Sequence, residues 1–254
     1  MARTAAIGAA VLCALSWPGA HAAAPVRREA AEVRAAGSAR LLYRETHWVL
    51  PGDSPQRWVL YRCPDGRAFA RKQVLGAGMA PDFTLEDGRD GYAEGARGGR
   101  APIVYVREDG HRRERPLPAP AGAVIDAGFD AAVRAHWSDL LAGRAVRLQF
   151  LLPSRQRYFP VRVQRIDSID WNGIRAERLR MRLDAWFGFA VPDVQLIYAR
   201  QDRRLLQFDG TGNLRDARGR YPQVRIAFAA AAADADAADV EAARRLPLDG
   251  RCPF

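Results

Sequence analysis

The chain has few of the residues that carry most enzyme chemistry. Its 254 residues include four histidines and three cysteines, and these form neither a zinc-ligand spacing nor a C-x-x-C redox pair. The motifs H-E-x-x-H, G-x-S-x-G and G-x-x-x-x-G-K-S/T do not occur. Asp167 and Asp170 come closest to an acid–base pair, but Asn172-Gly173 follows them, which is typical of a turn. The sequence therefore predicts no catalytic residue, no metal and no cofactor.

Lysine is almost absent as well. Lys72 is the single lysine among 39 basic residues, and the formal net charge is +10 at pH 7. Such a charge suits an anionic partner, such as a lipid head group, lipopolysaccharide or nucleic acid. The alternative, which we favour, is compositional: alanine, arginine, glycine and proline are enriched together, as a nucleotide bias would produce. Residues 1–22 resemble an export signal, and export disfavours nucleic acid as a partner.

A long apolar run occurs once, at the N-terminus. Residues 5–17 are apolar, follow Arg3, and precede Ala-His-Ala at 20–22. A basic start, a short apolar core and small residues before a cut are the parts of a signal peptide. The core has about 13 residues, fewer than the roughly 20 of a membrane-spanning helix. We expect residues 1–22 to be removed and the product to be a soluble or peripheral periplasmic protein, with Cys13 an ordinary leader residue.

Two cysteines remain after that cleavage, Cys63 and Cys252. In an oxidising compartment they can form a disulfide. The closed loop of about 190 residues would destabilise the unfolded chain by about 4–5 kcal/mol in chain-entropy terms. We expect this disulfide, with two free thiols or an intermolecular bond as the alternatives.

Most of the chain alternates between apolar and polar residues with a period of two. Turn sequences such as Pro64-Asp65-Gly66 and Asp109-Gly110 separate the alternating segments, which predicts short antiparallel strands. Residues 75–100 are glycine-rich and are expected to form a long loop. The predicted organisation is a single curved antiparallel β-sheet domain over 38–228. An N-terminal arm or short helix over 23–37 precedes it, and an Ala/Asp-rich tail over 229–254 follows.

One segment has a helical period instead. Apolar residues at i, i+4, i+8, i+11 and i+12 share one helical face: Phe129, Val133, Trp137, Leu140 and Leu141. A sheet of about nine or ten twisted strands curls. The predicted fold class is therefore mainly β (α+β), a strongly curved antiparallel meander or half-barrel with one central amphipathic helix packed on its concave face.

The helix and the most regular strand, residues 174–184, provide candidate binding residues. An apolar ligand cavity would be lined by Phe129, Val133, Trp137, Leu179, Met181 and Leu183. Side chains alternate along a strand, so a second set must point the opposite way, toward a membrane surface, an envelope partner or solvent: Arg178, Arg180 and Arg182. The tryptophans could either add to the cavity lining or pack the core: Trp48, Trp58, Trp137, Trp171 and Trp186.

The stretch Asp-Gly-Thr-Gly-Asn-Leu-Arg-Asp at 209–216 is the most distinctive polar segment. Its glycines allow a tight backbone path, and its Asp and Asn side chains can hydrogen-bond that backbone. Asp209, Asn213, Arg215 and Asp216 could form a polar site at the rim of the sheet. The favoured interpretation is an ordered connection in which Arg215 pairs with an aspartate.

Residues 127–144, 150–155, 208–216 and 224–228 together resemble an uncharacterised family of exported bacterial proteins. The order of strands also resembles the LolA/LolB-type lipoprotein carriers, in which a curved antiparallel sheet holds an apolar cavity under helices. The resemblance implies a periplasmic binding or carrier-like protein for a lipid or other apolar ligand. The alternative is a non-catalytic envelope accessory protein that docks on a partner or membrane surface through its Arg-rich face. The chain lacks the lipobox of an anchored, LolB-like acceptor.

Overall fold

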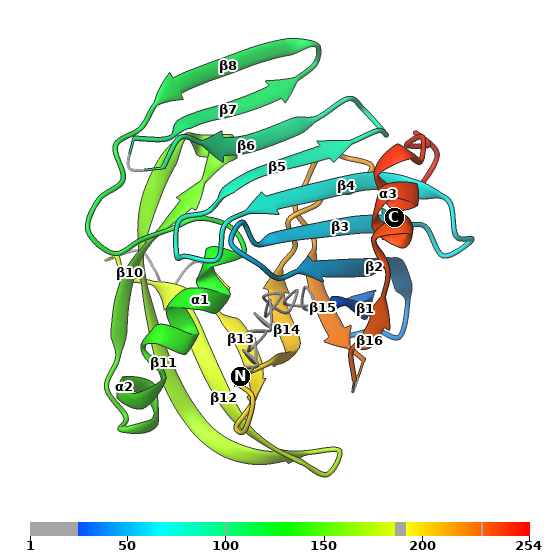
Figure 1. Cartoon of the computed structure of the whole chain (residues 1–254). Helices are drawn as coiled ribbons and strands as arrows, with labels where there is room; N and C mark the ends of the chain where they lie inside the picture. The colour runs from blue at the N-terminus through cyan, green and yellow to red at the C-terminus, as the bar shows by residue number, and fades with distance from the viewer. Residues whose placement is uncertain (1–24, 100, 186–191, 230) are drawn as a thin grey trace, which may run out of the picture.

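The computed structural model of the protein describes residues 25–99, 101–185, 192–229 and 231–254. Strands hold 51% of the residues and helices 11%. The described strands form one sheet of 16 strands, antiparallel except for one short parallel pair at an edge, that curves around two short helices without closing (Figure 1). The predicted mainly-β half-barrel is therefore confirmed. The predicted signal peptide, residues 1–22, lies outside the described residues.

The first half of the sheet is a succession of hairpins in which each strand pairs with the next. Asp109 and Gly110, both at positive φ, turn the last of these hairpins as the sequence predicts. The strands are β1 (Val26–Ala35), β2 (Leu41–Leu50), β3 (Gln56–Arg62), β4 (Ala68–Leu75), β5 (Asp82–Asp87), β6 (Ala93–Arg97), β7 (Ile103–Glu108) and β8 (His111–Pro116).

The second half begins at the opposite edge of the sheet and returns to the middle, where β15 pairs with β1. Its elements are β9 (Ala123–Val124), α1 (Gly128–Ala135), α2 (Trp137–Leu141), β10 (Val146–Leu152), the 3-10 turn η1 (Pro153–Arg155), β11 (Arg157–Trp171), β12 (Ile174–Leu183), β13 (Val194–Ala199), β14 (Leu205–Thr211), β15 (Gln223–Phe228), β16 (Ala233–Ala235) and α3 (Ala237–Arg245). The predicted helix is thus present, but it is broken at His136 into α1 and α2.

Two predicted segments are different in the structure. Residues 26–35 are a central strand, β1, and not an arm or a helix. Alanine, arginine and glutamate favour a helix locally, but hydrogen bonding to β2 and β15 outweighs that preference. The predicted loop over 75–100 is also wrong, because it contains β5 and β6. These additional strands bring the sheet beyond the nine or ten that were expected.

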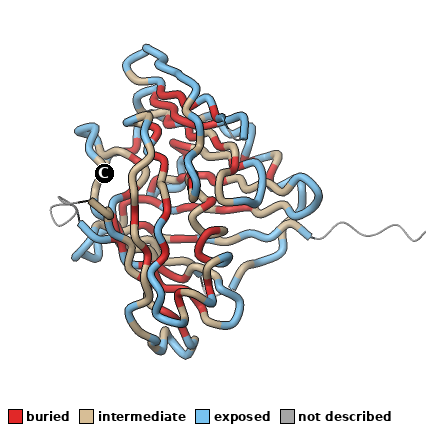
Figure 2. Tube along the Cα trace, turned by 90° about the vertical axis from the view of Figure 1, so that its left-hand side faces the viewer, coloured by how far each residue is buried: buried red, intermediate tan, exposed pale blue. Residues whose placement is uncertain are grey.

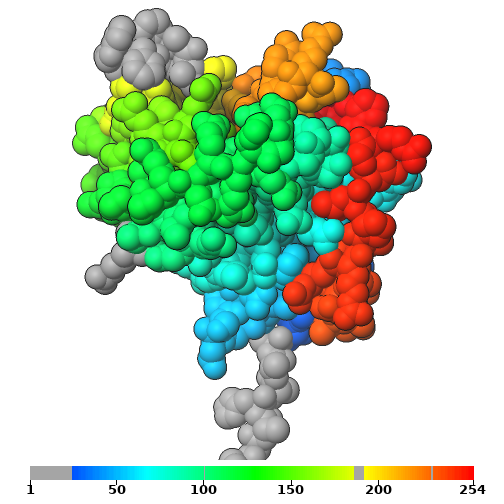
Figure 3. Space-filling model, turned by 90° about the horizontal axis from the view of Figure 1, so that it is seen from above, coloured from blue at the N-terminus to red at the C-terminus, as the bar shows by residue number. Residues whose placement is uncertain are grey.

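The C-terminal segment is ordered along the outside of the sheet (Figure 3). In α3, Val240 and Ala243 are buried against Trp48 and Leu60. Those two side chains point away from the concave face, because Glu45, His47 and Val59 alternate with them along β2 and β3. The predicted Ala/Asp-rich tail therefore contains a helix that packs on the convex face, followed by a final segment described below.

The core lies on the concave side, where buried residues run through the middle of the strands (Figure 2). One cluster covers the inner face of β1–β7 and includes Val33, Tyr61 and Phe69. A second joins α1 and α2 to β10–β14. Gly128 permits the helix to start between them, since a Cβ there would lie 2.0 Å from the carbonyl oxygen of Met79. The helical segment therefore packs on β10–β14 and, at Gly128, on the segment that precedes β5.

Candidate functional site

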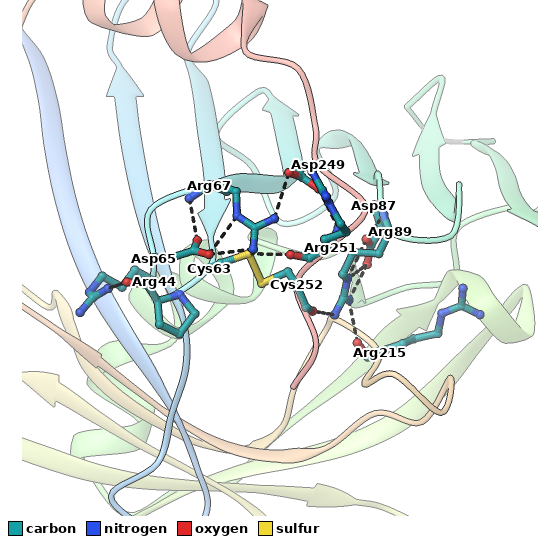
Figure 4. The surroundings of a disulfide bond; sticks show 11 residues. Arg44, Cys63, Asp65, Arg67, Asp87, Arg89, Arg215, Asp249, Arg251 and Cys252 are labelled. Atoms are coloured by element: carbon teal, nitrogen blue, oxygen red, sulfur yellow. Dashed lines mark hydrogen bonds and ion pairs between the residues drawn. A yellow bond between two sulfur atoms is a disulfide. The ribbon is translucent and has the colours of Figure 1, made fainter.

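The two ends of the half-barrel differ. At one end, residues 246–254 turn inward from α3, and Cys252 joins Cys63, which follows β3, in a disulfide (Figure 4). The Cα atoms are 5.7 Å apart, within the usual range for a disulfide. Arg67 supports the same segment by an ion pair to Asp249, with 3.0 Å between Nη1 and Oδ2. The predicted disulfide is thus present and fixes the C-terminus to the strands.

A buried arginine completes this closed end. The Arg89 guanidinium lies 4.7 Å from the ring centre of Phe69 and 4.4 Å from that of Phe254. It also pairs with Asp87, with 2.6 Å between Nη2 and Oδ2, and donates to the carbonyl oxygen of Arg215 at 2.7 Å. Phe254 therefore packs against the core and, together with Arg89, fills this end of the half-barrel.

The opposite ends of the same strands border a cavity of about 440 Å³. It lies where β1 and β3 begin and β2 ends, facing the end of α1 and the turn between β13 and β14. Its lining is Arg27, Glu29, Val49, Arg57, Arg134, Asp202, Arg204, Ala231 and Ala232. Arg27 lies 3.8 Å from Asp234, and Arg204 lies 3.5 Å from Asp202. Four arginines thus surround one cavity together with two acidic residues.

Asp130, in the first turn of α1, organises part of this cavity. Its Oδ2 lies 2.8 Å from Nη2 of Arg134 and 4.0 Å from Nη2 of Arg57. Burial raises the pKa of Asp130, while the two guanidiniums and the neighbouring Tyr198 hydroxyl oppose that rise. Only 18% of the Asp130 side chain is exposed. One largely buried carboxylate is therefore shared by two arginines of the cavity wall.

Deeper in the half-barrel is a set of polar residues that the sequence analysis missed. Tyr92 donates a hydrogen bond to Glu94 at 2.7 Å, and its hydroxyl lies 3.2 Å from that of Tyr221. Burial raises the pKa of Glu94 to about 7. Lys72 donates to both carboxylate oxygens of Asp126, at 2.9 and 3.1 Å. The one available signal was Lys72 itself, the single lysine of an arginine-rich chain.

The predicted cavity residues come together, but in a packed cluster. Val133, Trp137 and Leu179 are buried there, with Phe129 and Met181 at its edge. Leu183 shares their strand face and is half-buried. The described cavity at the open end is lined by other residues.

The predicted arginine row lies on the other face of β12. Arg178 pairs with Asp167 on β11, with 2.6 Å between Nη2 and Oδ2. Arg180 lies 3.8 Å from Asp193, and Arg182 is exposed. Two of the three guanidiniums therefore already have carboxylate partners.

The four residues of the predicted polar loop have separate partners and do not converge. Asp209 pairs with Arg225 at 2.7 Å, Asn213 donates to the Tyr61 hydroxyl at 3.2 Å, and Asp216 pairs with Arg220 at 3.1 Å. Arg215 lies over the Tyr92 ring and pairs with Asp90 and Glu108. The segment is an ordered connection in which Arg215 does pair with an aspartate.

The tryptophans are also dispersed. Trp48 and Trp58 lie in the cluster beneath α3, Trp171 lies in a small cluster at the far end of β11 and β12, and Trp137 is in the helix cluster. Trp186 falls outside the described residues. Within the described ranges, no His, Cys, Asp or Glu cluster could hold a metal ion. None of the helices described is long and apolar enough to cross a membrane.

The fold and the cavity define a mainly-β half-barrel with one filled end and one open, arginine-lined end. No family model and no curated protein matches the chain. Among solved structures, a β-barrel-like protein of the domain of unknown function DUF1849 from Brucella abortus is 9% identical. The match covers 84% of this chain and 98% of that chain, with a TM-score of 0.47.

Two further structures are similar at lower scores. A DUF1329 family protein from Desulfovibrio piger is 8% identical, over 81% of this chain and 83% of that chain, with a TM-score of 0.30. An outer membrane lipoprotein-sorting protein domain from Vibrio parahaemolyticus is 9% identical, over 87% and 92%, with a TM-score of 0.26. These are the kinds of protein that the sequence was found to resemble: uncharacterised bacterial proteins and LolA-type lipoprotein carriers. At these scores the likeness says nothing about ligand or activity.

Proposed function

We propose that this protein is an exported binding protein that takes up a lipid-like amphiphile at the open end of the half-barrel. The observation that carries the proposal is the cavity of about 440 Å³ between β1–β3, α1 and the β13–β14 turn. Small-molecule sites typically measure roughly 300–1,000 Å³. The opposite end is filled by the C-terminal segment and its disulfide, so a ligand would enter and leave at the arginine-lined end.

The lining favours an amphiphile over a purely apolar ligand. Val49, Ala231 and Ala232 offer apolar contact, whereas the arginines of the wall can hold a polar head group. Val133, Trp137 and Leu179, which were expected to line an apolar cavity, lie in a buried cluster and are not part of the lining of this cavity. The alternative function, docking through the arginine row, has less support because Arg178 and Arg180 pair with carboxylates.

Titration with a fluorescent long-chain fatty acid tests the binding function. We expect saturable one-to-one binding, because each CH₂ removed from water contributes about 0.8 kcal/mol. Val49→Phe should weaken binding about tenfold by filling the cavity. The matched control is Leu75→Phe, at an exposed position outside the cavity. Absence of saturable binding, or equal affinities for Val49→Phe and wild type, would contradict the proposal.

Export is a separate part of the proposal and has its own test. A cut after Ala22 should give a mature chain that begins at Ala23 and keeps no residue of the leader. Intact mass spectrometry of the protein from the periplasm of an expressing bacterium measures this directly. Retention of Arg3, or a lipid on Cys13, would show that the proposed processing is wrong.

A further inference from the structure

We infer that Arg57 and Arg134 form a head-group clamp for the carboxylate or phosphate of an anionic amphiphile, and that Asp130 is a built-in counter-ion which this head group displaces. The inference rests on the proposed function and specifies its ligand. The juxtaposition that carries it is two guanidiniums of the cavity wall meeting at one oxygen of one largely buried carboxylate.

Arg57 is the less satisfied of the two arginines. Its guanidinium makes no hydrogen bond to a described residue, and its ion pair with Asp130 spans 4.0 Å between Nη2 and Oδ2. Its side chain is 27% exposed and lines the cavity. A guanidinium carries five N–H donors in a planar fork suited to a carboxylate or phosphate. Arg57 therefore has donors available for a ligand.

Arg134 holds the second guanidinium in place. Besides the 2.8 Å contact with Asp130, its Nε donates to the carbonyl oxygen of Arg203 at 3.3 Å. Arg203 in turn donates from Nη1 to the carbonyl oxygen of Arg134 at 3.4 Å. These contacts hold the end of α1 against the β13–β14 turn, where Arg134 shares Oδ2 of Asp130 with Arg57.

Asp130 is a counter-ion that a ligand can replace. Its Oδ1 is buried and has no hydrogen-bond partner among the described residues, which is costly for a carboxylate. Burial raises its pKa, and Glu29 adds repulsion in the same direction. The Tyr198 hydroxyl already lies beside this carboxyl group and lowers its pKa, so Asp130 keeps that neighbour when the arginines turn to the ligand. The lining holds four arginines and two acidic residues, Glu29 and Asp202.

The test compares three probes by isothermal titration calorimetry: dodecyl phosphate, dodecanol and inorganic phosphate. Wild type should bind dodecyl phosphate about tenfold or more tightly than dodecanol, because the clamp reads the charge. Inorganic phosphate should bind weakly, because it lacks the apolar chain. If inorganic phosphate binds as tightly as dodecyl phosphate, the site takes a free anion, and the inference of an amphiphile is overturned.

Substitutions separate the counter-ion from general charge. Asp130→Asn should tighten dodecyl phosphate about tenfold and leave dodecanol unchanged, whereas Arg57→Gln should abolish the preference for phosphate. The matched control is Asp202→Asn, which removes a carboxylate of the same cavity that contacts neither clamp arginine. An equal gain in both asparagine variants would overturn the role assigned to Asp130.

The remaining outcomes are also decisive. If wild type binds dodecyl phosphate but Asp130→Asn binds it no better, the clamp is overturned while the binding function stands. If neither protein binds either amphiphile, both are overturned. Should Asp130→Asn fail to fold, Arg57→Gln decides alone, since the Arg57 guanidinium has no hydrogen bond to a described residue to lose. An unchanged phosphate preference in that variant overturns the inference.

Discussion

Removal of the disulfide by the double substitution Cys63→Ala with Cys252→Ala should lower the free energy of unfolding by about 4–5 kcal/mol. The two residues are 189 positions apart, so the bond closes most of the described chain into one loop and strongly restricts the unfolded ensemble. Both side chains are almost completely buried, and alanine keeps the site apolar. Guanidinium unfolding of the variant and of oxidised wild type, followed by far-UV circular dichroism, measures the difference.

Reduced wild type provides the matched control, because it lacks the bond but keeps both sulfur atoms. It should unfold close to the double variant. Loss of the bond should also loosen residues 246–254, since non-covalent contacts alone would then hold them, among them the Arg67–Asp249 pair, the Arg89 hydrogen bond to the carbonyl oxygen of Cys252 and the packing of Phe254. Amide exchange in that segment should rise well before global unfolding. Equal unfolding midpoints for oxidised and reduced wild type would contradict the prediction.

The features that could be predicted from the sequence are those set by local pattern or by simple elimination. Asp109-Gly110 and Asn172-Gly173 specify hairpin turns because both residues of each pair adopt positive φ. Cleavage of the predicted signal peptide would leave two cysteines, so each would have one possible intramolecular partner. The helical spacing of the apolar residues predicted a helix face that includes Val133 and Trp137, and this face packs against the sheet as expected.

The features that could not be predicted depend on tertiary context. In β5, Phe83 and Leu85 alternate with Thr84 and Glu86, but the surrounding glycines obscured this short signal. The candidate cavity was harder still. Arg57 and Arg134 are distant in sequence and meet only because the sheet curves around α1, and no spacing rule connects them. Whether apolar residues line a cavity or fill a core also depends on volumes that a sequence does not reveal.

Substitution of the buried carboxyl, Glu94→Gln, should remove much of the pH dependence of stability between about pH 5 and pH 8. Burial raises the pKa of Glu94 from 4.5 to about 7 in the folded protein. The folded state therefore binds a proton that the unfolded state has already lost within this window. Stability from this group is complete below the unfolded pKa and is lost as the pH rises through the folded pKa. The loss amounts to about 3 kcal/mol at 1.36 kcal/mol per pKa unit.

Glutamine keeps an acceptor for the Tyr92 hydroxyl, which lies 2.7 Å from the Glu94 carboxylate, but it cannot ionise. Glu94→Gln should therefore match wild type near pH 5 and exceed it at pH 8 by up to about 3 kcal/mol. Glu114→Gln, at an exposed position on β8, is the control and should follow wild type. Tyr92→Phe tests the same group in the opposite direction. The Tyr92 hydrogen bond lowers the pKa of Glu94 because it stabilises the charged carboxylate. Its removal should raise that pKa and extend the decline in stability to higher pH. Parallel stability profiles for wild type and Glu94→Gln, measured by denaturant unfolding at each pH, would show that Glu94 titrates like an exposed carboxyl.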